Sequence, residues 1–219
     1  MGVAVDERLR LLLVTDGRGD PDRLVAIVQA AVAGGLRAVQ VRELQMTAND
    51  LARLCDRLRP LLEQVEGCLL VNDRVDVVAA GHAHGAHVGF RSLVPASARR
   101  VVGDHRLLGM SVHDAGQLSE AVAAGCDYAV LAPVWSTATK PDAVGMGLSV
   151  AGGLTAAVDL PVLWLGGIDA QRAQAIGDLA PEQRPFGLAA CGAICRDPDP
   201  RQATRALLSS CAWMAAAAN

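Results

Sequence analysis

The sequence predicts an α/β protein built as a single (β/α)8 TIM barrel over residues 1–219. Eight short apolar runs recur roughly every 20 to 30 residues, and a segment of helical periodicity follows each one. The runs are apolar on both faces, as in a parallel sheet covered by helices. Because 219 residues suit one large domain, eight repeats in that length favour a closed barrel over an open sheet.

The apolar runs themselves are the expected strands. They are short, and glycine, asparagine or aspartate stands near most of their ends. In chain order the expected strands are residues 11–16, 38–43, 68–73, 85–89, 107–113, 128–134, 162–168 and 187–194.

The segments between the runs are rich in Ala, Leu, Gln and Arg, which are good helix formers. Several begin with Asp, Asn, Ser or Pro, as helix starts do, and 197–200 (Asp-Pro-Asp-Pro) is expected to start the last helix. The expected helices are residues 22–33, 49–65, 75–80, 95–102, 115–124, 148–158, 170–179 and 200–213.

Composition excludes several classes of protein. A net charge of -3, 3% aromatic residues and scattered basic residues argue against nucleic-acid binding. No apolar stretch approaches the roughly 18 residues that span a membrane, and the first ten residues include Asp6 and Glu7 where a signal peptide is basic. The six cysteines form no C-x-x-C pair, which favours reduced structural thiols. We expect a cytoplasmic protein without a membrane partner, and a homo-oligomer is compatible with the sequence.

Polar residues follow the expected strands at their carboxyl ends, where TIM barrels gather their catalytic groups. Strand alternation places Gln40 and Arg42 on one face, and Ser111 and His113 on one face of the fifth run. The alternative is that Arg42 forms a solvated ion pair with Glu43 and that His113 is a loop histidine. With the other polar strand ends beside them, one shared site is favoured.

Two further strand ends point to an anionic, phosphorylated ligand. The run that begins at Tyr128 ends in Thr137, Thr139 and Lys140, which places hydroxyls and an ammonium group at a pocket. Gly166 and Gly167 follow the seventh run, and Gly192 follows the eighth. Glycine-rich exits can bring backbone N–H groups against a phosphate, although a pair of glycines is also an ordinary tight exit from a strand.

Asn72 and Asp73 close the third run. They are consistent with a metal or pyrophosphate site, and equally with turn chemistry before a helix. His82, His84 and His87 resemble a metal-binding tract, but they fall before and inside the fourth strand. We expect these three histidines to be structural or surface residues away from the site.

Five ordered motifs resemble the thiamine-phosphate synthase and TenI superfamily, and the likeness extends over essentially the whole chain. In chain order they are Val-Gln-Val-Arg-Glu at 39–43, Val-Asn-Asp-Arg-Val-Asp at 71–76, Gly-Met-Ser-Val-His at 109–113, Pro-Val-Trp-Ser-Thr-Ala-Thr-Lys at 133–140 and Leu-Gly-Gly-Ile at 165–168. The synthase branch joins hydroxymethylpyrimidine pyrophosphate to a thiazole phosphate and releases pyrophosphate with magnesium. The TenI branch includes thiazole tautomerases, which aromatise thiazole carboxylate phosphate by moving a proton.

The resemblance implies roles for the polar strand ends. Gln40, Arg42 and Asn72 would face the pyrimidine and its pyrophosphate, and Asp73 would hold Mg²⁺. The remaining residues of the site would bind phosphate or the thiazole, and they are Ser111, Thr137, Thr139, Lys140, Gly166, Gly167 and Gly192.

Two departures favour the tautomerase branch. Leu44 stands where the synthase pattern has lysine, and Ser92 stands where it has a second magnesium carboxylate. His113 keeps the histidine of the Ser-Val-His motif, and an imidazole that titrates near neutrality suits proton transfer. The expected activity is therefore thiazole tautomerisation with His113 as the catalytic residue and no cofactor. Thiamine-phosphate synthase, which would need Mg²⁺, is the alternative, and a non-catalytic thiazole-phosphate-binding protein is a third.

Overall fold

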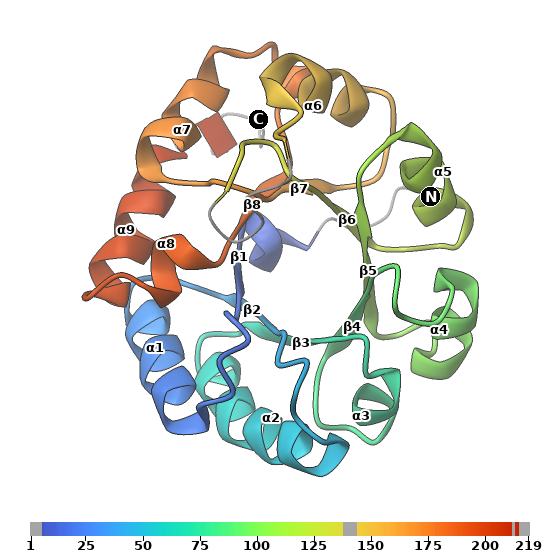
Figure 1. Cartoon of the computed structure of the whole chain (residues 1–219), viewed down its shortest axis with the longest axis vertical. Helices are drawn as coiled ribbons and strands as arrows, with labels where there is room; N and C mark the ends of the chain where they lie inside the picture. The colour runs from blue at the N-terminus through green and yellow to red at the C-terminus, as the bar shows by residue number, and fades with distance from the viewer. Residues whose placement is uncertain (1–5, 138–143, 212, 215–219) are drawn as a thin grey trace.

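The computed structural model describes residues 6–137, 144–211, 213 and 214. Eight parallel strands close into a barrel in chain order, and β8 pairs with β1. The strands form the inner ring of Figure 1. They are β1 Leu11–Val14, β2 Ala38–Val41, β3 Cys68–Asn72, β4 Gly85–Val88, β5 Leu107–Val112, β6 Tyr128–Leu131, β7 Val162–Trp164 and β8 Gly187–Ala190. The predicted (β/α)8 barrel is confirmed.

Helices surround the strands in an outer ring (Figure 1). The α-helices are α1 Pro21–Ala33, α2 Ala48–Glu63, α3 Val75–Ala79, α4 Pro95–Val102, α5 Ala115–Ala123, α6 Gly147–Ala156, α7 Ala170–Ala175, α8 Gly192–Cys195 and α9 Pro200–Ser210. Three short 3-10 helices, η1 Glu7–Arg10, η2 Ile176–Asp178 and η3 Pro181–Gln183, lie among the described residues. None of the described helices is both long and apolar enough to cross a membrane.

Side-chain caps explain where several helices begin. The carboxylate of Asp20 accepts the N–H of Arg23 at the start of α1, and Asp114 and Asp169 do the same for α5 and α7. Before α9, Asp199 Oδ1 accepts the N–H of Gln202 at 3.0 Å, which confirms the expected start of the last helix. Each cap satisfies an N–H group that the helix leaves without a partner.

All eight predicted strands extend past the observed strand ends, by one to four residues, and the error is largest in the last two. The eighth run was expected to extend over 187–194, but β8 ends at Ala190 and α8 starts at Gly192, where the N–H of Cys195 donates to Cys191 O at 2.8 Å. The seventh run was expected over 162–168, but β7 ends at Trp164. Gly166 and Gly167 have φ of 107° and 65°, a left-handed backbone that cannot continue a strand.

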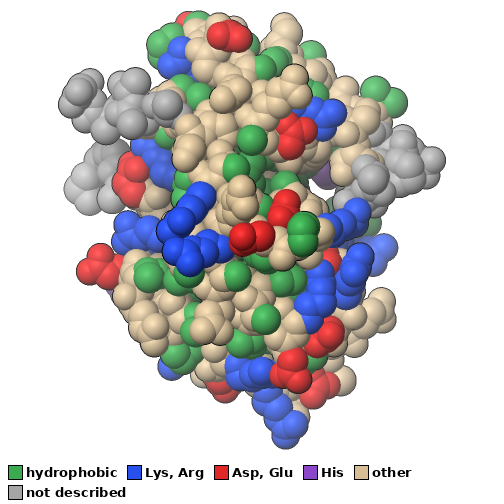
Figure 2. Space-filling view, turned by 90° about the vertical axis from the view of Figure 1, so that its left-hand side faces the viewer, with side chains coloured by type: hydrophobic (Ala, Val, Ile, Leu, Met, Phe, Trp, Pro, Cys, Tyr) green, Lys and Arg blue, Asp and Glu red, His purple; other side chains and the backbone are tan. Residues whose placement is uncertain are grey.

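The barrel has an inner and an outer apolar layer. The outer cluster packs the strands against the helices. The inner cluster fills the barrel, and it includes Leu12, Leu70, Tyr128 and Leu163. Leu9 of η1 belongs to the inner cluster and is 1% exposed, so the segment before β1 closes the amino-terminal end of the barrel. The carboxyl-terminal end carries the polar strand ends. Figure 2 shows acidic and basic side chains interspersed on one outer face.

Candidate active site at the carboxyl-terminal end of the barrel

Two amide side chains meet at the ends of β2 and β3. Gln40 is buried, and its Nε2 donates to Oδ1 of Asn72 at 2.9 Å. In this bond the amide nitrogen of Gln40 and the amide oxygen of Asn72 face each other. Gln40 therefore presents its carbonyl oxygen as an acceptor, and Asn72 presents its NH₂ group as a donor. A donor beside an acceptor suits the edge of a nitrogen heterocycle.

Ser111 ends a chain of hydrogen bonds that starts inside the barrel. The ring of His87 is fully buried, with Nδ1 at 3.1 Å from the Tyr128 hydroxyl and Nε2 at 2.8 Å from Ser111 Oγ. Burial, and then the nearby positive charge of Arg42, lowers the pKa of His87 from 6.5 to about 3. The imidazole is therefore neutral at physiological pH, with one nitrogen as donor and the other as acceptor.

The buried tyrosine decides the direction of this chain. If Tyr128 accepted a proton from Nδ1, its own hydroxyl hydrogen would be buried without an acceptor, which costs about 1–3 kcal/mol. Tyr128 therefore donates to Nδ1, and Nε2–H donates to Ser111 Oγ. This assignment leaves the Ser111 hydroxyl hydrogen free to donate to a ligand. Gly109 makes room for the arrangement, because a Cβ there would overlap the Tyr128 ring.

Arg42 supplies positive charge to the same end of the barrel. It follows β2, and its backbone N–H donates to Thr15 Oγ1 at 2.8 Å. Its charge lowers the pKa of both His87, beneath Ser111, and Cys191, just after β8. Among the described residues the guanidinium has no acceptor. The alternative ion pair with Glu43 does not form, because Glu43 instead accepts the N–H groups of two glycines in the β1–α1 loop.

Asp73 lies just beyond β3 with φ of 63°, a left-handed conformation that Asp tolerates better than most residues. The Ser92 hydroxyl donates to Asp73 Oδ1 and accepts the N–H of Gly89 at 2.8 Å. No group of three or more His, Cys, Asp or Glu that could hold a metal occurs in the described part of the chain. One carboxylate fits a Mg²⁺ ion only if a substrate phosphate supplies further oxygens, which is a common way for proteins to bind Mg²⁺.

The glycine pair after β7 packs closely under the loop after β6. A Cβ on Gly167 would lie 2.9 Å from Ser136 O, and the N–H of Trp135 donates to Gly166 O at 3.2 Å. Thr137 lies on the same loop and is half-buried. Two other predicted phosphate-binding residues, Thr139 and Lys140, lie outside the described residues.

Backbone N–H groups of glycines follow β7 and β8 at their carboxyl-terminal ends. In the described structure, the N–H groups of Gly166, Gly167 and Gly192 have no protein acceptor. Arg23 holds α8 in place, since its guanidinium binds both oxygens of buried Asp16 and also donates to Cys195 O at 2.6 Å. Free N–H groups at fixed positions are suited to a phosphate.

His113 lies at the rim rather than inside the barrel. It is exposed, and its ring Nδ1 hydrogen-bonds Ala132 O, the residue after β6. A carbonyl oxygen can only accept, so Nδ1 carries a proton. When only Nδ1 carries a proton, Nε2 is an acceptor with no partner among the described residues, and it could take a proton from a ligand.

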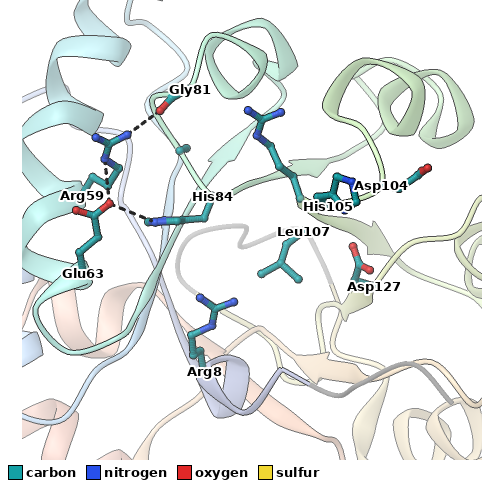
Figure 3. Close-up of a pocket in the computed structure, with 11 residues that line it drawn as sticks. Arg8, Arg59, Glu63, Gly81, His84, Asp104, His105, Leu107 and Asp127 are labelled. Carbon is teal, nitrogen blue, oxygen red and sulfur yellow. Dashed lines mark hydrogen bonds and ion pairs between the residues drawn. The ribbon is translucent and has the colours of Figure 1, made fainter.

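A separate cavity of about 450 Å³ lies at the opposite, amino-terminal end of the barrel (Figure 3). Arg8, His84, Leu107 and Asp127 line it, and each of them precedes or begins a strand. Its charged groups are largely paired with protein: Arg59 with Glu63 at 3.2 Å, Asp127 with Arg99 at 2.7 Å, and Arg8 with Asp6. None of the residues predicted for the site lines this cavity.

The prediction for His87 is partly wrong. Its structural role is as expected, but it lies beneath Ser111 rather than away from the site. Strand alternation could have found it, because residues 85 and 87 lie on the same face of the fourth strand, and a glycine at 85 leaves room inside the barrel. His82 and His84 do lie away from the site, near Asp56 and Glu63 of α2.

The comparisons with known proteins agree with this geometry. The family model described as thiamine monophosphate synthase, TMP-TENI, matches residues 11–180. A thiamine-phosphate synthase of Laribacter hongkongensis is 38% identical over 204 residues, which cover 93% of this chain and 94% of that protein. One of Roseiflexus castenholzii is 38% identical over 197 residues, which cover 89% and 85%.

A solved structure is also similar. The thiamine phosphate pyrophosphorylase of Pyrococcus furiosus matches with a TM-score of 0.83 and 28% identity, over 94% of this chain and 96% of that chain. The family model covers most of the residues that carry the barrel and its polar opening. The chain therefore belongs to the TMP-TENI family of thiamine biosynthesis.

Proposed function

We propose that this protein is a thiamine-phosphate synthase, which joins hydroxymethylpyrimidine pyrophosphate to thiazole phosphate. The sequence motifs favour a tautomerase, but the similar proteins carry the name of synthase, and the comparisons contain nothing specific to the tautomerase branch. The amide pair at Gln40 and Asn72, the cation at Arg42 and the carboxylate at Asp73 are present at one end of the barrel.

The observation that carries the proposal is the Arg42 guanidinium after β2, which has no acceptor among the described residues. A pyrophosphate that leaves takes negative charge with it, and a fixed cation stabilises that charge as it develops. Mg²⁺ bound at Asp73 would supply further positive charge to the same leaving group. The free N–H groups of Gly166, Gly167 and Gly192 support a second anion site, which we assign to the thiazole phosphate.

The amides and the serine hydroxyl orient the reactants. Gln40 and Asn72 would bind the polar edge of the pyrimidine, and the outward O–H of Ser111 would donate to a substrate oxygen or nitrogen. The thiazole phosphate would be held across the opening, and the thiazole nitrogen would face the pyrimidine carbon as its bond to pyrophosphate breaks. Holding both reactants in one geometry accounts for much of the rate that such a site can provide.

The direct test gives purified protein both substrates with MgCl₂ and follows thiamine phosphate by liquid chromatography. We expect product with the unmodified protein and a roughly 10- to 100-fold lower kcat/KM for Arg42→Ala, the effect of one charge-assisted hydrogen bond. Arg57→Ala is the matched control, because Arg57 pairs with Asp22 on the outer helices. No product, or an equal loss in both variants, would overturn the proposal.

Thiazole tautomerisation is the second candidate, and the observation that favours it is the free Nε2 of His113 at the rim. In a separate assay with the non-aromatic thiazole tautomer, His113→Gln should then slow aromatisation by about 10²- to 10⁴-fold and keep thiazole phosphate binding. Rapid aromatisation without any coupling activity would make the tautomerase the correct assignment.

A further inference from the structure

Two cysteines at α8 lie side by side against the end of β1. The N–H of Cys195 donates to Cys191 O at 2.8 Å, so the two residues are one helical turn apart and share a face. Cys191 Sγ lies 3.9 Å from Thr15 O, and Cys195 Sγ lies 3.8 Å from Val14 O. Both sulfur atoms therefore face two consecutive carbonyl groups of the same strand end.

The two thiols differ in reactivity. A hydrogen bond from the Cys195 thiol lowers the pKa of Cys191, and the positive charges of Arg196 and Arg42 act in the same direction against burial and Asp16. The same hydrogen bond, together with burial, raises the pKa of Cys195. The single S–H of Cys195 can point at Val14 O or at Cys191 Sγ, and it turns to the sulfur when Cys191 loses its proton.

The other four cysteines offer an internal comparison. Burial raises the pKa of Cys55, Cys68 and Cys211 to about 12 and that of Cys126 to about 11. All four are buried, whereas Cys191 is partly exposed beside the opening of the barrel. Since the thiolate is the nucleophile, Cys191 is the cysteine best placed to meet a small oxidant from solvent.

We propose that Cys191 and Cys195 are an oxidation site, which hydrogen peroxide converts into a reversible disulfide. The Cys191 thiolate attacks one peroxide oxygen, the O–O bond breaks, hydroxide leaves, and Cys191 becomes a sulfenic acid. The Cys195 sulfur then attacks the Cys191 sulfur, the S–S bond forms, and the sulfenic oxygen leaves as water. In total two thiols and one peroxide give one disulfide and two waters.

The bond has a structural consequence at Gly192. A disulfide joins its two sulfur atoms at about 2.05 Å, which is much closer than two thiols that share a hydrogen bond. The four-residue helix must therefore tighten or unwind when the bond forms. Gly192 and Ala193 lie within the closed ring and move with it, and so does the free N–H group of Gly192.

Peptide mapping tests the bond directly. The full chain is treated with hydrogen peroxide, its remaining thiols are alkylated in denaturant, and it is digested with trypsin. No Lys or Arg stands between residues 191 and 195, so both cysteines stay on one peptide. We expect that peptide to lack both alkyl groups and to be lighter by two hydrogen atoms than the reduced form. Dithiothreitol should restore alkylation, and the other four cysteines should be alkylated throughout.

Two variants sharpen the result. In Cys195→Ser the reaction should stop at the sulfenic acid of Cys191, which dimedone traps, whereas Cys211→Ser should form the disulfide as the unmodified protein does. Amide hydrogen exchange at 192–194 should differ between the oxidised and reduced forms. The proposal is overturned if Cys195 remains alkylatable after Cys191 is oxidised, or if one of the four buried cysteines reacts first. Unchanged exchange at 192–194 would overturn the coupling to Gly192.

Discussion

The histidine beneath Ser111 is held neutral in the interior, and this links the site to the stability of the protein. His87 has a pKa of about 3 when folded and about 6.5 when exposed. Between these values the unfolded chain binds a proton that the folded chain does not, so the free energy of unfolding falls as pH falls. For this one group the slope is about 1.4 kcal/mol per pH unit below pH 6.5.

The variant His87→Gln should reduce that slope by one proton while the rest of the chain titrates as before. Urea unfolding at a series of pH values from 7 to 5, at one constant ionic strength, measures the slope in each protein. His84, whose pKa burial also lowers, contributes in the same direction in both proteins and cancels in the comparison. Equal slopes in the two proteins would show that His87 is protonated in the folded state.

Ser92 determines how much negative charge the loop after β4 offers to a metal. Its hydroxyl is bonded to Asp73, so a carboxylate at position 92 would stand beside the carboxylate at position 73. Ser92→Asp should lower the Mg²⁺ concentration that gives half the maximal coupling rate. Combined with Leu44→Lys, it should raise the coupling rate by a larger factor than either change alone. Ser119→Asp on exposed α5 is the charge control.

A Ser92→Asp protein whose coupling rate has the same Mg²⁺ dependence as the unmodified one would contradict a metal site at Asp73.

The sequence could predict Asp73 as a polar strand end, but not its contact with Ser92. That contact joins the loops after two neighbouring strands, 19 residues apart in the chain, and Asp73 there has a left-handed backbone.

The exit of β7 shows how backbone shape, rather than side chains, forms part of the site. Gly167→Ala should destabilise the protein by more than about 1 kcal/mol, because φ is 65° and the new Cβ would press on Ser136 O. Gly153→Ala is the matched control, since this glycine of α6 has nothing within 4 Å of a new Cβ, and alanine should stabilise the helix by about 0.5–1 kcal/mol. Urea unfolding of both variants measures the two changes in the free energy of unfolding, which should have opposite signs. An unchanged free energy of unfolding in Gly167→Ala would mean that the loop after β6 shifts at little cost to make room for the new Cβ.

The elements themselves were largely predictable from periodicity, and their ends were not. The strand pattern is apolar on both faces, so the residues of 191–194 fit a strand as well as a buried helix. What ends β8 is the local hydrogen bonding of Cys191 with Cys195 and the tie from Arg23 to α8. The first contact is local and the second joins residues 172 positions apart in the chain, and the apolar pattern predicts neither.

At the scale of the molecule, the interior of the barrel depends on one residue that precedes the first strand. Leu9 is 1% exposed within the inner apolar cluster. Leu9→Ala should lower the free energy of unfolding by about 2–5 kcal/mol and keep a single transition, because Leu9 packs in a cluster that joins β1, β2, β3, β6, β7 and β8. Val122→Ala on the exposed side of α5 should change it little. Two separate transitions in Leu9→Ala would show that the end closed by η1 unfolds independently.

The whole fold was predictable because the repeat of apolar runs and helices is a property of the entire chain, and errors at single boundaries do not change it. The site was predictable only where alternation on one strand sufficed, as for Gln40 and Ser111. The direction of the bonds through Tyr128 and His87 requires β4, β5 and β6 in register, and this register is a property of the folded sheet that alternation on one strand does not predict.

The pairing of β1 with β8 has a consequence for how the protein is made. β1 is synthesised before the other seven strands, but its second neighbour is β8, so one side of β1 stays unpaired until residues 187–190 have been synthesised. An unpaired apolar strand edge invites association with other chains. Nascent chains that stall before β8 should therefore be the species that chaperones hold, and they should aggregate when released without them.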